Sequence, residues 1–211
     1  MPDSPPSATQ ALEILKRGNA RFVEQLSNPG LTPAMAGPVA LPEIQRPKAI
    51  ILGCSDARVP AEIVFDQGLG DLFVIRVAGN IVAPSLIGSV EFAAAEFGTR
   101  LVVVLGHTRC GAVQATIEEI RGPGGPASAN LASIVNRIRP HVEDYLTGAP
   151  DAPLEAVWDG AVRENVRASV EELRAGSAIL EDLIADDGLI VVGAEYCLGS
   201  GVVTFLDERE G

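Results

Sequence analysis

Short aliphatic runs alternate along this chain with longer stretches in which apolar residues keep helical spacing. Runs rich in Ile, Val and Leu occupy residues 48–53, 101–106 and 189–193, and a similar run spans residues 71–76. Continuous apolar runs of this length are typical of strands that are buried on both faces of a parallel sheet. We therefore expect four parallel strands in one central sheet.

A fifth apolar run, at residues 202–206, follows the fourth too closely for a helical crossover. Only residues 195–201 are left to connect them. A connection of this length favours antiparallel pairing, so we expect this last strand at an edge of the sheet. The predicted fold class is α/β: a single domain with a mostly parallel central sheet of four parallel strands plus an antiparallel edge strand, flanked by helices.

Apolar residues at three- and four-residue steps predict the helices that cover this sheet. The expected helical segments are 7–26, 61–65, 84–97, 111–120, 131–145, 154–173 and 177–184. Pro140 is expected to bend the fifth of them. Gly98 and Gly188 are placed to end two of the others.

The N-terminal helix, which Ser7 is expected to cap, carries one apolar stripe. The stripe consists of Leu12, Leu15, Phe22 and Leu26. It must be buried either on its own domain or on a partner subunit, and the pattern leaves both open. Five prolines in residues 28–47 predict an extended segment. We therefore divide the chain into an N-terminal helical arm with an extended segment (1–47) and an α/β domain (48–211).

Composition narrows the classes of protein that fit. The 211 residues are 47% hydrophobic, enough for one sizeable core, and the net charge of −12 disfavours binding to nucleic acid or to an anionic membrane. We see neither an apolar run of about 20 residues nor a basic start with an apolar region, so we expect no membrane span and no secretory signal. Three cysteines fit a reduced compartment, and the cytoplasm is the expected location.

Two polar clusters follow predicted strands directly. Residues 54–58 read Cys-Ser-Asp-Ala-Arg, and residues 107–111 read His-Thr-Arg-Cys-Gly. Because parallel strands end at the same edge of a sheet, where α/β proteins build their sites, these clusters are expected to meet. Two thiols and one imidazole suit zinc and leave a fourth position open. The alternative is that the cysteines only pack in the core.

These clusters resemble the paired motifs of the β-class carbonic anhydrases, and the similarity extends over residues 10–207. Further similar segments are 66–73, 76–80, 164–166 and 192–201. The identity and order of the candidate ligands and the Asp-Arg pair all match the family.

The resemblance implies a carbonic anhydrase, a zinc lyase that hydrates carbon dioxide reversibly to bicarbonate and a proton. Cys54, His107 and Cys110 would bind one Zn²⁺ per subunit, and residues 48–211 would be the zinc-binding domain. Zinc lowers the pKa of its water from 15.7 toward about 7, so a zinc hydroxide can attack carbon dioxide. Asp56 would orient the hydroxide while the planar fork of Arg58 holds Asp56. A solvated surface ion pair is the alternative for these two residues.

The resemblance also implies a small apolar pocket for carbon dioxide. Its expected substrate-binding residues are Gln45, Phe73, Ala78, Phe92 and Gly111. Phe92 would come from the partner subunit, and Phe73 and Ala78 would come from the same subunit as Phe92. Phe92 occupies a position where plant-like members often have tyrosine. For Gln45 the alternative is a solvated loop residue, and for Gly111 a glycine needed only for packing.

Two positions bear on the subclass. In some bacterial members an aspartate moves onto zinc at low pH, and a tryptophan just before the first zinc cysteine helps to stabilise that form. Here residues 50–52 are Ile, Ile and Leu, and the only tryptophan is Trp158. Gln45 instead matches a glutamine of the plant-like subclass that donates a hydrogen bond to substrate, while Arg76 is common to both subclasses. We expect an enzyme that is open and active at neutral pH.

Family members form dimers or larger even-numbered oligomers, so we expect self-association as a dimer or tetramer. The apolar stripe of the N-terminal helix is the feature that would be exchanged between subunits. Two other functions stay open: hydrolysis of carbonyl sulfide or carbon disulfide at the same site, and a zinc-binding scaffold or sensor without turnover. Cys197 is interpreted as structural, and His141 as a solvated helical residue rather than a proton shuttle.

Overall fold

The computed structural model describes residues 5–27, 44–122 and 125–206. Within them lies one five-stranded sheet in the order β2-β1-β3-β4-β5. The strands are β1 (Ala49–Gly53), β2 (Leu72–Arg76), β3 (Leu101–His107), β4 (Ile190–Tyr196) and β5 (Val203–Phe205). The first four are parallel and β5 is antiparallel to β4, so the predicted fold class is confirmed.

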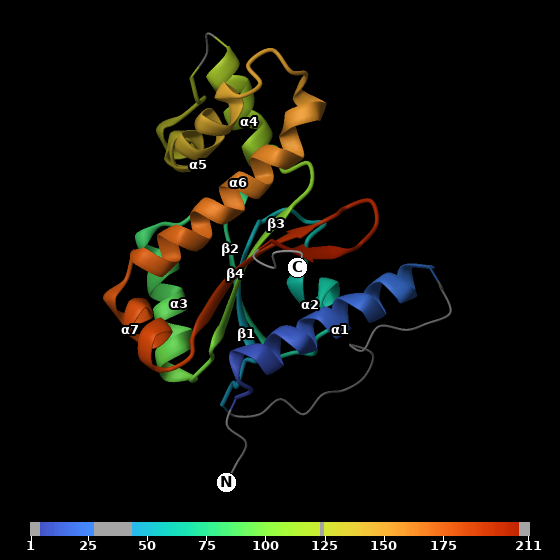
Figure 1. The fold of residues 1–211 in the computed structure, drawn as a ribbon, viewed down its shortest axis with the longest axis vertical. Coiled ribbons are helices and arrows are strands. Elements are labelled where there is room, and N and C mark those ends of the chain that lie inside the picture. The colour runs from blue at the N-terminus through green and yellow to red at the C-terminus, as the bar shows by residue number, and fades with distance from the viewer. Residues whose placement is uncertain (1–4, 28–43, 123–124, 207–211) are drawn as a thin grey trace.

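Helices cover both faces of this sheet, as Figure 1 shows. They are α1 (Ala8–Ser27), α2 (Ala61–Val64), α3 (Pro84–Glu96), α4 (Gly111–Arg121), α5 (Ala129–Thr147), α6 (Leu154–Ala175) and α7 (Ala178–Asp186), with a 3-10 turn η1 (Ala78–Asn80). Helices α1 and α2 pack on one face, and α3, α6 and α7 on the other. Helices α4 and α5 lie beyond the sheet edge where β3 ends. Pro140 lies inside α5, and the bend expected there stays a prediction.

Successive residues of the central strands point to opposite faces, which explains their unbroken apolar runs. In β1, Ile51 belongs to the core under α1, whereas Ile50 and Leu52 belong to the core under α3 and α6. All three side chains are fully buried. A strand with helices on both faces has no exposed face, so no polar residue interrupts it.

Helix α1 packs on its own domain, which is one of the two alternatives left open by its apolar stripe. Leu15 is fully buried in the core that also contains α2. The Asn19 side chain donates to the carbonyls of Val64 and Gly201, at 3.0 and 2.8 Å. Ser7 caps the helix by accepting from the Gln10 amide at 3.3 Å. Most of the extended segment predicted at 28–47 lies outside the described residues, which resume at residue 44.

Strand β4 is longer than the predicted run at 189–193. It continues to Tyr196, which pairs with His107 in β3, while Glu195 pairs with Thr204 in β5. Backbone pairing with strands on both sides extends β4 past the end of its aliphatic sequence. In the described parts of the chain, no helix is both long enough and apolar enough to span a membrane.

Glycines allow α6 to lie very close to the sheet. A Cβ atom added to Gly106 in β3 would lie 2.4 Å from a methyl carbon of Val166 in α6. A Cβ atom added to Gly193 in β4 would lie 2.9 Å from the other methyl carbon. This close contact brings side chains of α6 within reach of the segments that follow β2 and β3.

Candidate metal centre

Three candidate ligands meet where two neighbouring strands end. Cys54 directly follows β1, His107 is the last residue of β3, and Cys110 is the N-cap of α4. One donor atom from each lies within 4.8 Å of the others, and all three residues are buried. Among the described residues this is the group of His, Cys, Asp or Glu side chains able to hold a metal ion.

The donor atoms fit a tetrahedral zinc ion. The two sulfur atoms of Cys54 and Cys110 lie 4.0 Å apart. Two zinc–sulfur bonds of about 2.3 Å at a tetrahedral angle would separate them by about 3.8 Å. The Nε2 atom of His107 is buried and has no hydrogen-bond partner among the described residues. A buried polar atom of this kind needs an explanation, and a metal ion supplies one.

The other ring nitrogen of His107 fixes which atom faces the site. Its Nδ1 lies 3.0 Å from the backbone carbonyl oxygen of Thr108. A carbonyl only accepts, so Nδ1 carries the hydrogen and Nε2 presents its lone pair toward the two thiols. The sequence left this acceptor open, because a backbone carbonyl leaves no signal in the side-chain pattern.

The electrostatics of the site favour thiolate formation. The Cys110 thiol, as a hydrogen-bond donor, lowers the pKa of Cys54 to about 4, against the opposing effect of burial. The same interaction, together with burial, raises the pKa of Cys110. Burial lowers the pKa of His107, but the negative charge of the neighbouring Cys54 raises it, and the net shift is upward. The neighbouring Cys110 thiol therefore favours the thiolate form of Cys54, which is the form that binds metals.

Asp56 and Arg58 form a bidentate ion pair beside these ligands. Arg58 donates from Nε to Asp56 Oδ1 at 2.9 Å and from Nη2 to Oδ2 at 2.7 Å, and its backbone N–H also donates to Oδ1 at 2.9 Å. The Oδ2 atom lies 3.9 Å from His107 Nε2. The Arg58 hydrogen bonds hold the pKa of Asp56 well below its usual range. Asp56 is therefore a carboxylate that faces the candidate ligands.

Arg76 holds the loop that carries Cys54 and Asp56. Its guanidinium donates to the carbonyl oxygen of Cys54 at 3.0 Å and to that of Asp56 at 2.6 Å. This role of Arg76 was not predicted from the sequence. The available signal was its place at the end of β2, where it pairs with Gly53 of β1, directly before the loop.

Further contacts to the ligand loops come from α6 and from η1. The Trp158 indole N–H donates to the Cys110 carbonyl at 2.9 Å. Asp159 accepts from the backbone N–H of Arg109 at 3.0 Å. The backbone N–H of Gly79 donates to the sulfur of Cys54 at 3.4 Å. The roles of Trp158, Asp159 and Gly79 were not predicted from the sequence, because each residue is far along the chain from the atom that it contacts.

The predicted substrate residues are found in three places. Ala78 opens η1, next to Gly79, and Gly111 is the exposed first residue of α4, next to Cys110. Phe73 and Phe92 lie together, with ring centroids 6.3 Å apart, and both pack near Phe97. Gln45 is exposed before β1.

The structure therefore brings Ala78 and Gly111 next to the ligand loops. No hydrogen bond or ring contact among the described residues joins Gln45, Phe73 or Phe92 to the ligands. Phe92 is half exposed, and its expected place in a partner subunit stays a prediction.

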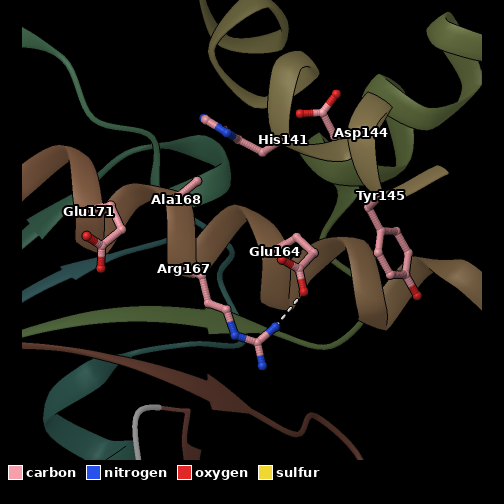
Figure 2. A pocket seen from close by; sticks show the side chains of 7 residues that line it. All are labelled: His141, Asp144, Tyr145, Glu164, Arg167, Ala168 and Glu171. Carbon is pink, nitrogen blue, oxygen red and sulfur yellow. Dashed lines mark hydrogen bonds and ion pairs between the residues drawn. The ribbon is translucent and has the colours of Figure 1, made fainter. Parts of the chain in front are cut away.

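The second histidine lines a separate polar cavity of about 310 Å³ between α5 and α6. Figure 2 shows His141, Asp144 and Tyr145 from α5 facing residues 164–171 of α6. His141 is partly exposed, and its Nε2 lies 3.2 Å from a carboxylate oxygen of Glu172. The predicted solvated histidine thus has an acidic neighbour.

Cys197 is partly buried just past β4, and all three cysteines are free. The Ser200 hydroxyl lowers the pKa of Cys197. Its interpretation as structural stays a prediction.

Comparisons with known proteins agree with this geometry. A family model described as carbonic anhydrase matches residues 49–203. A carbonic anhydrase of Mycolicibacterium smegmatis is 39% identical over 204 residues, which cover 96% of this chain and 94% of that protein.

Solved structures of β-carbonic anhydrases also resemble the chain. One from Aspergillus fumigatus has a TM-score of 0.71 at 27% identity and covers 96% of this chain and 92% of that one. One of two described as tetrameric, from Sordaria macrospora, has a TM-score of 0.70 at 22% identity, covering 95% and 98%.

Proposed function

Because the chain belongs to the carbonic anhydrase family, in its β class, we propose that it hydrates carbon dioxide reversibly to bicarbonate and a proton with one zinc ion per subunit. The observation that carries this proposal is the set of donors in Cys54, His107 and Cys110, within 4.8 Å of one another. The buried Nε2 of His107, without a partner among the described residues, supports the same assignment. Zinc held there would lower the pKa of a water molecule from 15.7 toward about 7.

Asp56 orients the attacking oxygen in this proposal. An ionised carboxylate only accepts hydrogen bonds, so Oδ2 can take the hydrogen of that oxygen and turn a lone pair toward carbon dioxide. Arg58 keeps the carboxylate in place through its two parallel hydrogen bonds. Since Arg58 already engages both oxygens of Asp56, the carboxylate would not coordinate the metal, and the site would stay open at neutral pH.

An apolar wall would receive carbon dioxide, which is small and carries no charge. We assign Phe73, Ala78 and Phe92 to this wall, with Phe92 supplied by a second subunit and Phe73 and Ala78 by the same subunit as Phe92. Gln45 and the backbone N–H of Gly111 would donate hydrogen bonds to bound oxygen atoms. The exposed position of Gly111 at the N-terminus of α4 supports its role, because helix N-termini favour anions.

The expected assembly is a dimer or tetramer of this chain in the cytoplasm, without nucleic acid or membrane partners. The tetrameric description of the Sordaria macrospora relative supports self-association. Three free cysteines support a reducing compartment.

The test is stopped-flow hydration of carbon dioxide by zinc-loaded protein at pH 7 and 8.5. We expect activity at both values, and a loss of about 100-fold or more in Asp56→Asn. The matched control is Asp187→Asn, which breaks an exposed pair with Arg100 and should leave the rate unchanged.

Other results would contradict the proposal. Activity at pH 8.5 alone would mean that Asp56 closes on the metal. A zinc-loaded protein inactive at both values would direct the search to carbonyl sulfide and carbon disulfide. Inactivity toward those substrates as well would favour a zinc scaffold or sensor.

A further inference from the structure

We propose that Asn165 and Ser169 of α6 are positioning residues for the metal centre, acting through the η1 turn on the thiolate of Cys54. This inference rests on the proposed zinc site and adds residues that do not touch the metal or the substrate. It starts from a chain of hydrogen bonds that runs from the buried face of α6 to the sulfur of Cys54.

The first link is the amide of Gly79. Its N–H donates to Cys54 Sγ at 3.4 Å, and this bond stabilises the negative charge of a thiolate. The amide points this way because Gly79 has a φ of 72°, in the left-handed region that favours glycine. A Cβ atom at Gly79 would lie 2.7 Å from a side-chain carbon of Ile138. The turn therefore has one close-fitting conformation.

The second link joins this turn to α6. The side-chain amide of Asn165 donates to the carbonyl oxygen of Gly79 at 2.9 Å. The hydroxyl of Ser169 donates to the carbonyl oxygen of Asn80 at 3.2 Å. Two adjacent peptide groups of η1 are thus fixed by side chains one helical turn apart on α6.

The positions of these two residues on α6 are unusual for polar side chains. Asn165 is 2% exposed and Ser169 is 4% exposed, and they share their face with the buried residues Val162, Val166 and Val170. The opposite face carries Glu164, Arg167 and Glu171, which Figure 2 shows at the polar cavity below α5. Burying an amide and a hydroxyl costs stability unless each makes hydrogen bonds. Here the bonds go to a turn that also contacts a candidate zinc ligand.

Loss of the Asn165 hydrogen bond is expected to change the affinity for the metal and the spectrum of the metal site. The carbonyl held by Asn165 and the N–H that contacts Cys54 belong to the two peptide groups on either side of the Gly79 Cα atom. Without the Asn165 bond the turn can rotate about this Cα atom, and the Cys54 thiolate then loses its N–H donor. Loss of such outer partners typically weakens metal binding by about 10- to 100-fold. A thiolate without the donor also gives up electron density more readily, so sulfur-to-metal charge transfer needs less energy.

The experiment compares Asn165→Ala with Asn19→Ala in the full-length protein. Asn19 is also a buried asparagine that bonds backbone carbonyls, but it lies on α1, on the other face of the sheet. Zinc affinity is measured by chelator competition, and the absorption spectrum is recorded after cobalt(II) replaces zinc. For Asn165→Ala we expect affinity about tenfold weaker and a charge-transfer band at lower energy. For Asn19→Ala we expect a lower unfolding temperature but wild-type affinity and spectrum.

Other outcomes of this experiment would overturn either the inference or the proposed function. Wild-type affinity and spectrum in Asn165→Ala would overturn the inference, and so would an equal loss in Asn19→Ala. If Asn165→Ala does not fold, Ser169→Ala decides by the same measurements, with a smaller loss in the same direction expected and no loss overturning the inference. A wild-type protein that binds neither zinc nor cobalt would refute the proposed function instead.

Discussion

Arg58 holds both carboxylate oxygens of Asp56 through side-chain hydrogen bonds of 2.9 and 2.7 Å. Only a planar guanidinium can make two parallel bonds of this kind, so lysine cannot replace it. We expect Arg58→Lys to bind zinc normally but to lower kcat/KM for carbon dioxide hydration by about 100-fold, because the carboxylate loses its position. Stopped-flow assays together with zinc analysis check this. Wild-type kcat/KM in Arg58→Lys would contradict the role of the bidentate pair.

The pKa of Asp56 leads to a prediction about pH dependence. Hydrogen bonds from Arg58 hold this pKa well below its usual range, so Asp56 is ionised at every pH above about 5. The stabilisation from its ion pair is complete there and is lost only in acid, as the pH falls through the folded-state pKa. We therefore expect Asp56→Asn to lower kcat by a similar factor at pH 6.5, 7.5 and 8.5. A shift in the midpoint of the pH–rate profile would indicate that Asp56 itself titrates in this range.

Arg76 is predicted to matter for the metal rather than for the substrate. It holds the carbonyl oxygens of Cys54 and Asp56, so its removal frees the loop that carries both side chains. We expect Arg76→Ala to weaken zinc binding by about tenfold in chelator competition. Arg174→Ala, which removes a guanidinium bound to the Val191 carbonyl elsewhere in the sheet, is the control and should keep wild-type affinity.

The strands and the candidate ligands were predictable from sequence because both leave local patterns. A strand such as β3 shows as an aliphatic run, and His107 and Cys110 stand out as polar residues directly after it. The hydrogen bonds that hold the ligand loops from more distant parts of the chain leave no such pattern. Trp158 bonds a carbonyl 48 residues away and Asn165 one 86 residues away, and a backbone carbonyl looks the same at every residue.

Two other features could not be predicted from sequence for the same reason. The end of β4 at Tyr196 is set by pairing with β3 and β5, which is a property of the sheet and not of the local sequence. The stripe on α1 predicted burial, but only the fold shows that the covering surface is the helix's own domain.

The glycine at the contact between β3 and α6 predicts a large effect on stability. A methyl group at Gly106 would lie 2.4 Å from a carbon of Val166. We expect Gly106→Ala to lower the free energy of unfolding by about 2 kcal/mol, measured by denaturant unfolding of the zinc-loaded protein. Combining it with Val166→Ala should cost less than the sum of the two single changes, because the second change makes room for the first.

A glycine elsewhere supplies the matched control. Gly88 lies inside α3, and a Cβ atom there would meet nothing within 4 Å. Gly88→Ala should therefore stabilise the fold by about 0.5–1 kcal/mol. Equal effects at Gly106 and Gly88 would contradict the close packing of α6 on β3.

Trp158 makes the metal site visible by fluorescence. It is the only tryptophan in the chain, and its indole N–H donates to the carbonyl of Cys110 at 2.9 Å. Removal of zinc by a chelator frees Cys110 and changes the surroundings of the indole, so we expect its emission to change and to return on titration with one zinc ion per chain. Cys110→Ser should abolish most of this response, because its hydroxyl is a poor zinc ligand compared with a thiolate. If direct analysis shows that zinc binds to the wild-type protein but the Trp158 emission does not change, Cys110 and its carbonyl do not move with the metal.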